Sequence, residues 1–477
     1  MALSNQLKNQ HLLWRAAFGP MAENVNELSE VSQKDLYQLL LKTSSKKPEQ
    51  LNVASNLFDG LVKGVQDIGK MEKISKDEKK MLRKQSVEDL KSLNLTWLGQ
   101  MINSESQFRE KMSLFWHGHF ACRVVNIFFQ QQLLNVIREN AIGNFGDLLR
   151  EVSKSPAMLS FLNNQQNKKQ HPNENFAREV MELFTMGRGN YTENDIKEGA
   201  RAFTGWGFNL KGEFIDRPFL HDTGKKTFLG KTGNFDGDDI IDILLEQKQT
   251  AKFITKKLYR YFVNDTADES KIELLLEGFY ESGYDIKKLL ANIYTSDWFY
   301  NDKNIGNRIK SPIELLVGIR RLIPMELEQP EAQLLFQRAL GQILFYPPNV
   351  AGWPGGKNWI DSSALMLRMR IPQIITNADD FAVKPKDDDD TMMGKEGVDT
   401  NAKARQLNVK VDWTSVTKVF DTTTKENLLQ KVSDVVLQTK SRINPVIINK
   451  YIDRQARDTY IKTTMVELMS TPEYQLC

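Results

Sequence analysis

The chain has very few of the residues that build cross-linked or metal-dependent scaffolds. Its 477 residues include only two cysteines, Cys122 and Cys477, and five histidines. Two isolated cysteines form neither a disulfide framework nor a C-x-x-C pair, which excludes the protein classes built on those features. The sequence also lacks H-E-x-x-H, G-x-S-x-G, Walker A and dinucleotide-binding patterns. No common catalytic motif therefore identifies the protein.

An excess of one charge and long apolar runs are missing as well. Lys and Arg number 64 against 61 Asp and Glu, a formal charge of +3. Nucleic-acid and anionic-membrane surfaces need clustered excess base, so we expect neither partner. No apolar run approaches the roughly 18 residues of a membrane span. Residues 1–19 lack a continuous apolar segment and a cleavage site, so the sequence predicts a soluble cytoplasmic protein without a secretory signal.

Helical periodicity dominates what is present. Residues 75–102 predict one long amphipathic helix, residues 106–165 predict three further helices, and helical patterns resume after residue 236. Gly, Asp, Pro and aromatic residues replace this pattern around 207–235, where KTFLGKTG is typical of a β-hairpin. The fold class expected is mainly α, a large multi-helix domain with a small β-hairpin-rich insertion around 207–235.

The domain organisation follows from a change of composition near the C-terminus. Residues 384–408 are charged, contain the acidic run Asp387–Asp390 and lack periodicity, which is typical of a flexible loop or linker. We expect residues 1–383 to form the helical core domain. Residues 409–477 return to helical patterns and are expected to pack on that core.

Four of the five histidines lie in or beside three segments, FWHGHF at 115–120, the stretch 171–206 and HDTGKKTFLG at 221–230. His117 and His119 are two positions apart, about 200° around a regular helix, so they could chelate one metal only from a turned segment, which Gly118 permits. The alternative is that His119 extends the apolar face of Phe115 as a hydrogen-bonded core residue.

Paired carboxylates follow in the second segment. Glu179 and Glu182 are three apart and share a helix face. Arg178 is placed to pair with Glu174 and with Glu182, so the alternative is a solvated face of ion pairs. Asn173 and Asn175 add polar groups at the helix start. Asn173 can cap it, whereas Asn175 has no obvious packing role.

The third segment places His221 and Asp222 at the opening of a loop. Loops on a rigid scaffold often carry catalytic residues, although Asp222 could equally cap a turn over TGKK. Arg201 and Trp206 are expected to line or support the same region. Trp353 and Trp359, in a Pro/Gly-rich loop, could shape a rim, but we favour a role as plugs over the helical core.

Seven ordered segments resemble the bacterial family called domain of unknown function 1800. They are HLLWRAAFG, FWHGHF, NENFAREVMELFTMG, YTENDIKEGARAFTGW, HDTGKKTFLG, SPIELLVGIRRL at 311–322 and YPPNVAGWPGGKNWI at 346–360. The resemblance runs from about residue 10 to the C-terminus, where Thr471–Tyr474 replaces the family's SPEF. It implies an α-helical fold and a partner protein similar to sulfatases and alkaline phosphatases. Many family members are exported, and the family often has Asp at the position of Asn163.

Two functions are consistent with these patterns. The one favoured slightly is a non-catalytic binding or scaffold protein, in which the polar motifs form a buried hydrogen-bond network. The alternative is a metal-assisted enzyme, most plausibly a hydrolase, in which a divalent ion lowers the pKa of a bound water. The candidate catalytic residues are His117, His119, Glu179, Glu182, His221 and Asp222. The candidate metal ligands are His117, His119 and His221, and the candidate supporting residues are Asn173, Glu174, Asn175, Arg178, Arg201 and Trp206.

Overall fold

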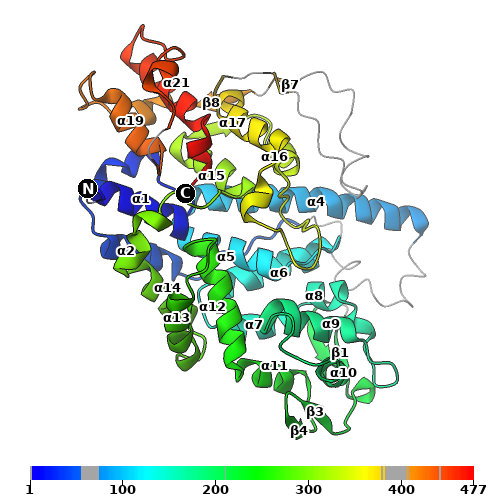
Figure 1. Ribbon diagram of the computed structural model, residues 1–477. Helices are drawn as coiled ribbons and strands as arrows, with labels where there is room; N and C mark the ends of the chain where they lie inside the picture. The colour runs from blue at the N-terminus through cyan, green and yellow to red at the C-terminus, as the bar shows by residue number, and fades with distance from the viewer. Residues whose placement is uncertain are drawn as a thin grey trace.

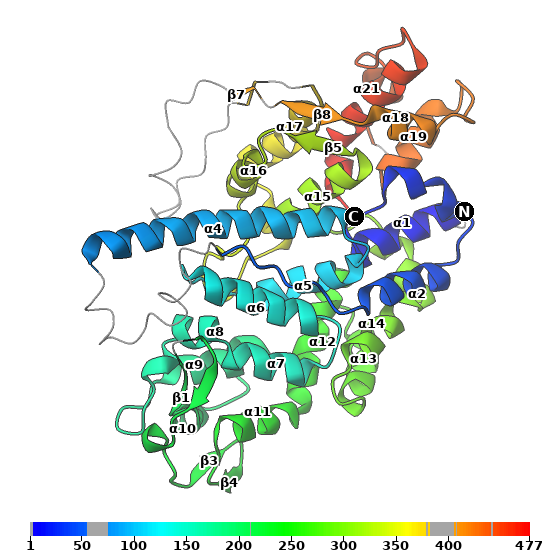
Figure 2. The same ribbon diagram turned by 180° about the vertical axis from the view of Figure 1, so that it is seen from behind.

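Two groups of helices lie on opposite sides of one long helix, α4 (Lys76–Asn103), in the computed structural model (Figure 1). Figure 2 shows the same arrangement from behind. The structure describes residues 3–54, 75–209, 211–377, 380–381, 405–406, 408–439 and 442–477. The predicted mainly α fold and the long helix over 75–102 are confirmed. In these ranges no helix is both long and apolar enough to cross a membrane.

The larger group of helices, in the lower half of Figure 1 and at its left edge, shares one buried apolar core. Its aromatic side chains include Phe115, Trp116, Phe145 and Phe184, which bury large apolar areas. The group comprises α1 (Asn5–Ala16), α2 (Gln33–Ser44), α5 (Gln107–His119), α6 (Ile127–Asn140), α7 (Phe145–Lys154), α8 (Pro156–Phe161), α9 (Glu174–Glu179), α10 (Glu193–Ala202), α11 (Gly237–Leu245), α12 (Lys248–Phe262), α13 (Glu269–Glu281) and α14 (Ile286–Tyr294).

The smaller group lies above α4 in Figure 1 and has a second apolar core. It comprises α15 (Pro312–Leu322), α16 (Ala332–Leu340), α17 (Ser362–Asn377), α18 (Trp413–Lys418), α19 (Leu428–Val436), α20 (Pro445–Ile448) and α21 (Arg457–Met469). The helices after residue 409 therefore share a core with α15, α16 and α17. The acidic run Asp387–Asp390 lies outside the described residues.

Helix α4 joins the two groups through a third apolar core. Leu93, Trp97 and Met101 of α4 are buried with Leu134 of α6 on one side and with Val317 of α15 on the other. The N-terminal turn of α4 begins with a capping box between Ser75 and Glu78, as the Ser-x-x-Glu sequence dictates. Burial of this helix begins at Ser86, because its first turns carry mainly charged residues.

Short elements connect these helices. The described strands form two-stranded antiparallel pairs: β1 (Trp206–Phe208) with β2 (Phe214–Asp216), β3 (Lys226–Phe228) with β4 (Lys231–Gly233), β5 (Met325–Leu327) with β8 (Val409–Val411), and β6 (Asp380–Phe381) with β7 (Arg405–Gln406). A π-helical segment, η5 (Val180–Thr185), continues α9. The 3-10 helices are η1 (Ala22–Asn24), η2 (Asn26–Ser29), η4 (Asn164–Gln166), η6 (Pro218–Leu220), η7 (Asp297–Tyr300), η8 (Asp302–Asn304), η9 (Gly356–Trp359) and η10 (Pro472–Gln475).

The expected hairpin-rich insertion is confirmed by β1–β2 and β3–β4. Strand pairing of Phe228 with Lys231 leaves the two-residue turn Leu229–Gly230, and both residues have positive φ, 45° and 81°. This conformation is typical of the tight turns that match the twist of a hairpin. The backbone N–H of Leu229 donates to Asp195 of α10 at 2.8 Å, which fixes the turn against the helix.

Two features differ from the sequence-based expectation. Residues 106–165 contain four helices, α5 to α8, rather than three, because Ser155 ends α7 and its hydroxyl then caps α8, where Pro156 follows. The pairs β5–β8 and β6–β7 are additional, and each joins segments about 25 to 85 residues apart, which local sequence patterns do not show.

A buried charge cluster fixes the two helix groups to each other. Glu314 in the first turn of α15 accepts hydrogen bonds from Lys111 of α5 and from Arg308, and all three side chains are buried. Glu314 Oε2 also accepts from the backbone N–H of Ser311 at 2.8 Å. Burial opposes ionisation of Glu314, but Arg308 and Lys111 outweigh it and hold the pKa of this carboxyl well below its usual range.

Replacing this carboxylate should therefore unfold the protein more easily. Glu314→Gln removes the carboxylate that pairs with two buried cations, and we expect a loss of about 3–5 kcal/mol in the free energy of unfolding. Urea denaturation measures it. Glu326→Gln in the exposed middle of β5 is the control and should change stability by less than about 0.5 kcal/mol. Equal effects of the two substitutions would contradict the structural role of Glu314.

Candidate functional site

His117 and His119 both lie in α5 and therefore face different sides of that helix. His117 Nε2 accepts the backbone N–H of Phe345 at 3.1 Å, and its ring contacts those of Trp97, Phe345 and Trp353. Phe345 has φ = 69°, a left-handed conformation that a bulky residue rarely adopts. Burial lowers the pKa of His117 to about 3. The neutral ring thus supports a strained turn.

His119 has a defined tautomer. Its Nε2 lies 3.2 Å from the carbonyl oxygen of Phe184, and its Nδ1 lies 3.1 Å from Lys257 Nζ. A carbonyl can only accept, so Nε2 carries the proton and Nδ1 accepts from Lys257. Burial, and then the charge of Lys257, lower the pKa of His119 well below its ordinary value. His119 is a neutral acceptor for a lysine.

The paired carboxylates have other partners. Glu182 accepts a hydrogen bond from the Tyr191 hydroxyl at 2.5 Å. Among the described residues, no hydrogen bond or ion pair joins His117 or His119 to Glu179 or Glu182. Partial burial, and then the neighbouring Glu182, raise the pKa of Glu179. His119 does contact the segment that follows Glu179 and Glu182. It contacts the backbone carbonyl of Phe184 instead of either carboxylate.

One of the two expected ion pairs of Arg178 is confirmed. Arg178 contacts Glu174 at 3.3 Å, as predicted. The predicted pair with Glu182 is wrong, because Arg178 binds Glu193 of α10 at 3.0 Å instead. The helix widens at Val180 into the π-helical segment η5, which alters the spacing of side chains around the axis and turns Glu182 toward Tyr191.

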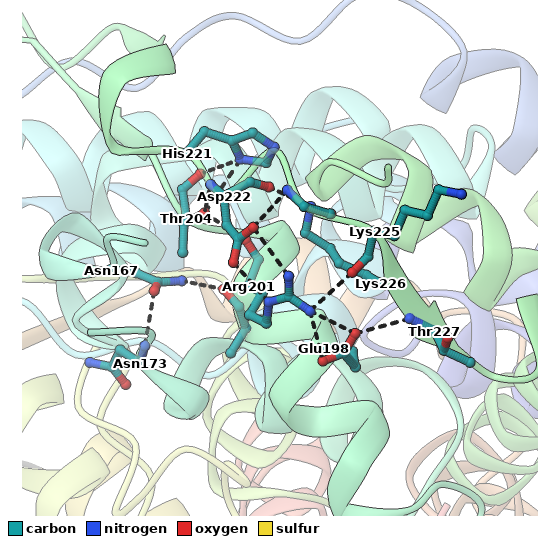
Figure 3. Close-up of polar contacts among 12 residues, drawn as sticks. Asn167, Asn173, Glu198, Arg201, Thr204, His221, Asp222, Lys225, Lys226 and Thr227 are labelled. Carbon is teal, nitrogen blue, oxygen red and sulfur yellow. Dashed lines mark hydrogen bonds and ion pairs between the residues drawn. The ribbon is translucent and has the colours of Figure 1, made fainter. Parts of the chain in front are cut away.

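Arg201 and Asp222 form the centre of a polar cluster beside the hairpins (Figure 3). Arg201 donates from Nε to Asp222 Oδ2 at 2.8 Å and from Nη1 to both oxygens of Glu198 at 3.0 and 2.9 Å. The hydrogen bonds from Arg201 lower the pKa of Asp222. Asp222 Oδ1 also accepts the backbone N–H of Gly224 at 2.8 Å, so the carboxylate caps the turn at TGKK.

His221 completes this cluster through Thr204. Its Nδ1 lies 2.9 Å from the carbonyl oxygen of Thr204, and the Thr204 hydroxyl accepts the backbone N–H of Asp222 at 2.8 Å. The ring nitrogen next to a carbonyl must carry a proton, so Nδ1 of His221 donates to Thr204. The cluster fastens the loop at 221–227 to the end of α10.

The three asparagines of this region hold the start of α9. Asn173 caps the helix by accepting from the N–H of Asn175 at 3.0 Å, as predicted. Asn175 Nδ2 donates to the carbonyl of Leu162 at 3.1 Å. Asn163 has φ = 58°, a left-handed conformation that both Asn and Asp tolerate. Trp206 is buried against the rings of neighbouring phenylalanines and supports the same region.

A cavity of about 490 Å³ opens on another side of His119. Its walls come from α5, α12, the segment before α15 and the loop around η9. The residues that line it are Leu114, Phe115, Gly118, His119, Lys257, Arg260, Tyr261, Asp265, Arg308, Ser311, Gln342, Ala351, Trp353, Pro354, Gly355, Gly356, Lys357, Asn358 and Trp359. Three segments singled out in the sequence, FWHGHF, SPIELL and VAGWPGGKNW, meet here.

The loop that forms the outer wall touches α5 directly. Gly352 has φ = 80°, and a Cβ added there would lie 2.3 Å from the carbonyl oxygen of Gly118. Only glycine permits this approach. Trp353 and Trp359 of this loop line the cavity and form part of its outer wall, and their expected role as plugs over the helical core stays a prediction.

Sequence reasoning missed Lys257, the lysine beside His119. Lys257 Nζ donates to His119 Nδ1 and, at 3.2 Å, to the carbonyl of Leu183. Burial lowers its pKa to about 8. The available signal was the i, i+4 row Phe253–Lys257–Tyr261, in which a lysine stands between two aromatic residues on one helix face.

The candidate metal ligands do not converge. His117 faces the turn at Phe345, His119 faces Lys257 and Phe184, and His221 belongs to the cluster of Figure 3. In the part of the chain that the structure describes, no group of three or more His, Cys, Asp or Glu side chains is placed to hold a metal ion. The predicted six-residue site is thus divided between separate regions.

The cluster of Figure 3 predicts a stability effect. Asp222→Asn removes the charge that Arg201 binds, and we expect a loss of about 1–3 kcal/mol in the free energy of unfolding. Thermal unfolding measures it. Asp242→Asn is the matched control, because Asp242 pairs with Arg150 but its side chain is 59% exposed. An exposed pair contributes at most about 1 kcal/mol, so equal losses would contradict a structural role for Asp222.

Lys257 predicts a dependence of stability on pH. Its pKa is about 8 in the folded protein and 10.5 ordinarily. Between these values the unfolded chain binds more protons, so the free energy of unfolding should rise with pH, by at most about 3 kcal/mol. The difference between the parent protein and Lys257→Met isolates this contribution, measured by urea denaturation at pH 7 and 10. If the parent protein and Lys257→Met differ by the same free energy of unfolding at pH 7 and at pH 10, burial does not lower the pKa of Lys257.

Comparison with known proteins identifies a family. No curated protein and no solved structure matched the chain significantly. A family model described as protein of unknown function (DUF1800) matches residues 11–476, nearly the whole chain. The match includes α5, α12, the cluster of Figure 3 and the loop that closes the cavity. The chain therefore belongs to the DUF1800 family.

Proposed function

We propose that the protein is a non-catalytic binding protein and that the cavity between α5, α12 and the loop around η9 holds its ligand. The observation that supports this proposal is the lining of the cavity. Aromatic side chains, Phe115, Tyr261, Trp353 and Trp359, stand beside polar groups in a hollow of about 490 Å³. Ligand sites for small molecules commonly combine an apolar, aromatic lining with a few polar groups in a volume of this order.

The bonding of the histidines supports binding over catalysis. A general base needs a free nitrogen within reach of its substrate. His117 Nε2 and both nitrogens of His119 are occupied by partners within the protein. The low pKa of each ring, caused by burial, also opposes proton uptake near neutral pH.

A metal-assisted hydrolase is the alternative proposal. It would draw on His221 and Asp222, or on Glu179 and Glu182, with a divalent ion. These groups lie in regions apart from the cavity, and no particular contact favours their joint action. A metal inventory of the purified protein, with His221→Ala as the comparison, tests this alternative.

Partner and location are further proposals. We propose a partner similar to sulfatases and alkaline phosphatases because the family resemblance implies one. We propose a cytoplasmic location because Cys122 and Cys477 are free thiols, which is usual in a reducing compartment. Co-purification with the tagged chain tests the partner.

Binding in the cavity predicts a local change at two tryptophans. The chain has eight tryptophans, and 5-fluorotryptophan labelling gives each a ¹⁹F resonance that single Trp→Phe variants assign. Benzoate and its neutral analogue benzamide should shift the resonances of Trp353 and Trp359, because both rings line the cavity. The resonance of Trp413, which packs on the core of the smaller helix group, should not move.

A substitution gives the matching control for this prediction. Trp353→Ala should weaken benzamide binding by about fivefold or more, since an aromatic contact contributes about 1 kcal/mol. Trp413→Ala should leave binding unchanged. Absence of any shift at Trp353 and Trp359 with all ligands would refute the proposed site.

A further inference from the structure

The charges around the cavity are unequal. Four cationic residues line it, Lys257, Arg260, Arg308 and Lys357, against one carboxylate, Asp265. Arg308 is already neutralised by Glu314. Arg260 and Lys357 are exposed, and water screens them. Lys257 is different because it is partly buried in the wall.

Lys257 has no anionic partner among the described residues. Its ammonium group has three N–H donors, of which one reaches His119 Nδ1 and one the carbonyl of Leu183. Both acceptors are neutral. Buried charges in proteins are ordinarily paired with an opposite charge, since a buried ion without one is costly. The remaining donor of a residue that lines the cavity is therefore available to a ligand.

The scaffold holds this ammonium in place. His119 cannot rotate away, because its Nε2 is bound to the carbonyl of Phe184. Leu183 and Phe184 lie in the last turn of η5, which ends at Thr185, so their carbonyls have no partner within the helix and accept from side chains. The Lys257 ammonium also lies 4.7 Å from the centre of the Phe253 ring. Such a fixed cation orients an anion at little entropic cost.

We propose that the cavity binds an organic anion whose carboxylate, phosphate or sulfate group pairs with Lys257 while its apolar body lies against Trp353 and Trp359. This inference rests on the proposed function and adds the chemical class of the ligand. A cavity of about 490 Å³ is much larger than an inorganic anion, which would leave the faces of its aromatic walls without a contact. An anion with a flat organic body can pair with the charge of Lys257 and pack against the aromatic walls of the cavity.

The test compares four probes that share one ring. Benzoate, phenyl phosphate and phenyl sulfate carry the three anionic groups, and benzamide is the neutral analogue of benzoate. Titrations follow the ¹⁹F resonances of Trp353 and Trp359. We expect the best anion to bind about tenfold more tightly than benzamide, the ratio that a charge-assisted hydrogen bond provides. The ranking of the three anions identifies which group the site takes.

Variants of neighbouring lysines assign the preference to one residue. Lys257→Met keeps the length of the side chain. It should remove the roughly tenfold preference for the best anion over benzamide and leave the affinity for benzamide unchanged. Lys256→Met removes the same charge from the adjacent position of α12, where Lys256 pairs with the exposed Glu269, and should keep the preference. Lys257→Gln is the second variant if Lys257→Met does not fold.

The outcomes separate this inference from the proposed function. Equal binding of benzamide and all three anions to the parent protein overturns the anion site but leaves the cavity as a ligand site, and that comparison needs no variant. A preference for anions that persists in Lys257→Met overturns the role of Lys257. Tight binding of inorganic phosphate, added as a fifth probe without a ring, contradicts the proposal that the ligand has an organic body. No binding by any probe overturns the proposed function itself.

Discussion

The ion cluster at Glu314 is the constraint on which the arrangement of the molecule depends. Glu314, Lys111 and Arg308 come from α15, α5 and the segment between the helix groups, and each is buried. None of these charges is stable in an apolar interior unless the others are present. The two groups of helices can therefore pack in only one relative position. Since α5 and the Arg308 segment also line the cavity, its walls are set by the same cluster.

The local features of the fold could be predicted because neighbouring residues determine them. The cap at Asn173 and the hairpin around Gly230 each depend on a few adjacent side chains and on backbone conformation. The same holds for the pair between Glu174 and Arg178. These signals identified the mainly α class and the hairpin insertion correctly.

The site could be predicted only in part, because distant residues decide the role of each side chain. The sequence marks His119, Trp353 and Trp359 as notable, but it cannot show that His119 is bound on both sides by Lys257 and Phe184. A change from α-helix to π-helix at Val180 moved Glu182 out of the expected row. Lys257 was missed because a lysine among aromatic residues usually extends its charge to water.

The contact between Gly352 and Gly118 has a consequence for the range of shapes that the cavity can adopt. Backbone lies directly on backbone there, so the outer wall cannot move inward, and any side chain at 352 would force it outward. The depth of the hollow is thus a property of the main chain, whereas its width is a property of the side chains at 353 and 357–359. Substitutions in that loop would change what the hollow accepts while leaving its floor at His119 and Lys257 intact, so the charge and the shape of an acceptable ligand are controlled by separate parts of the chain.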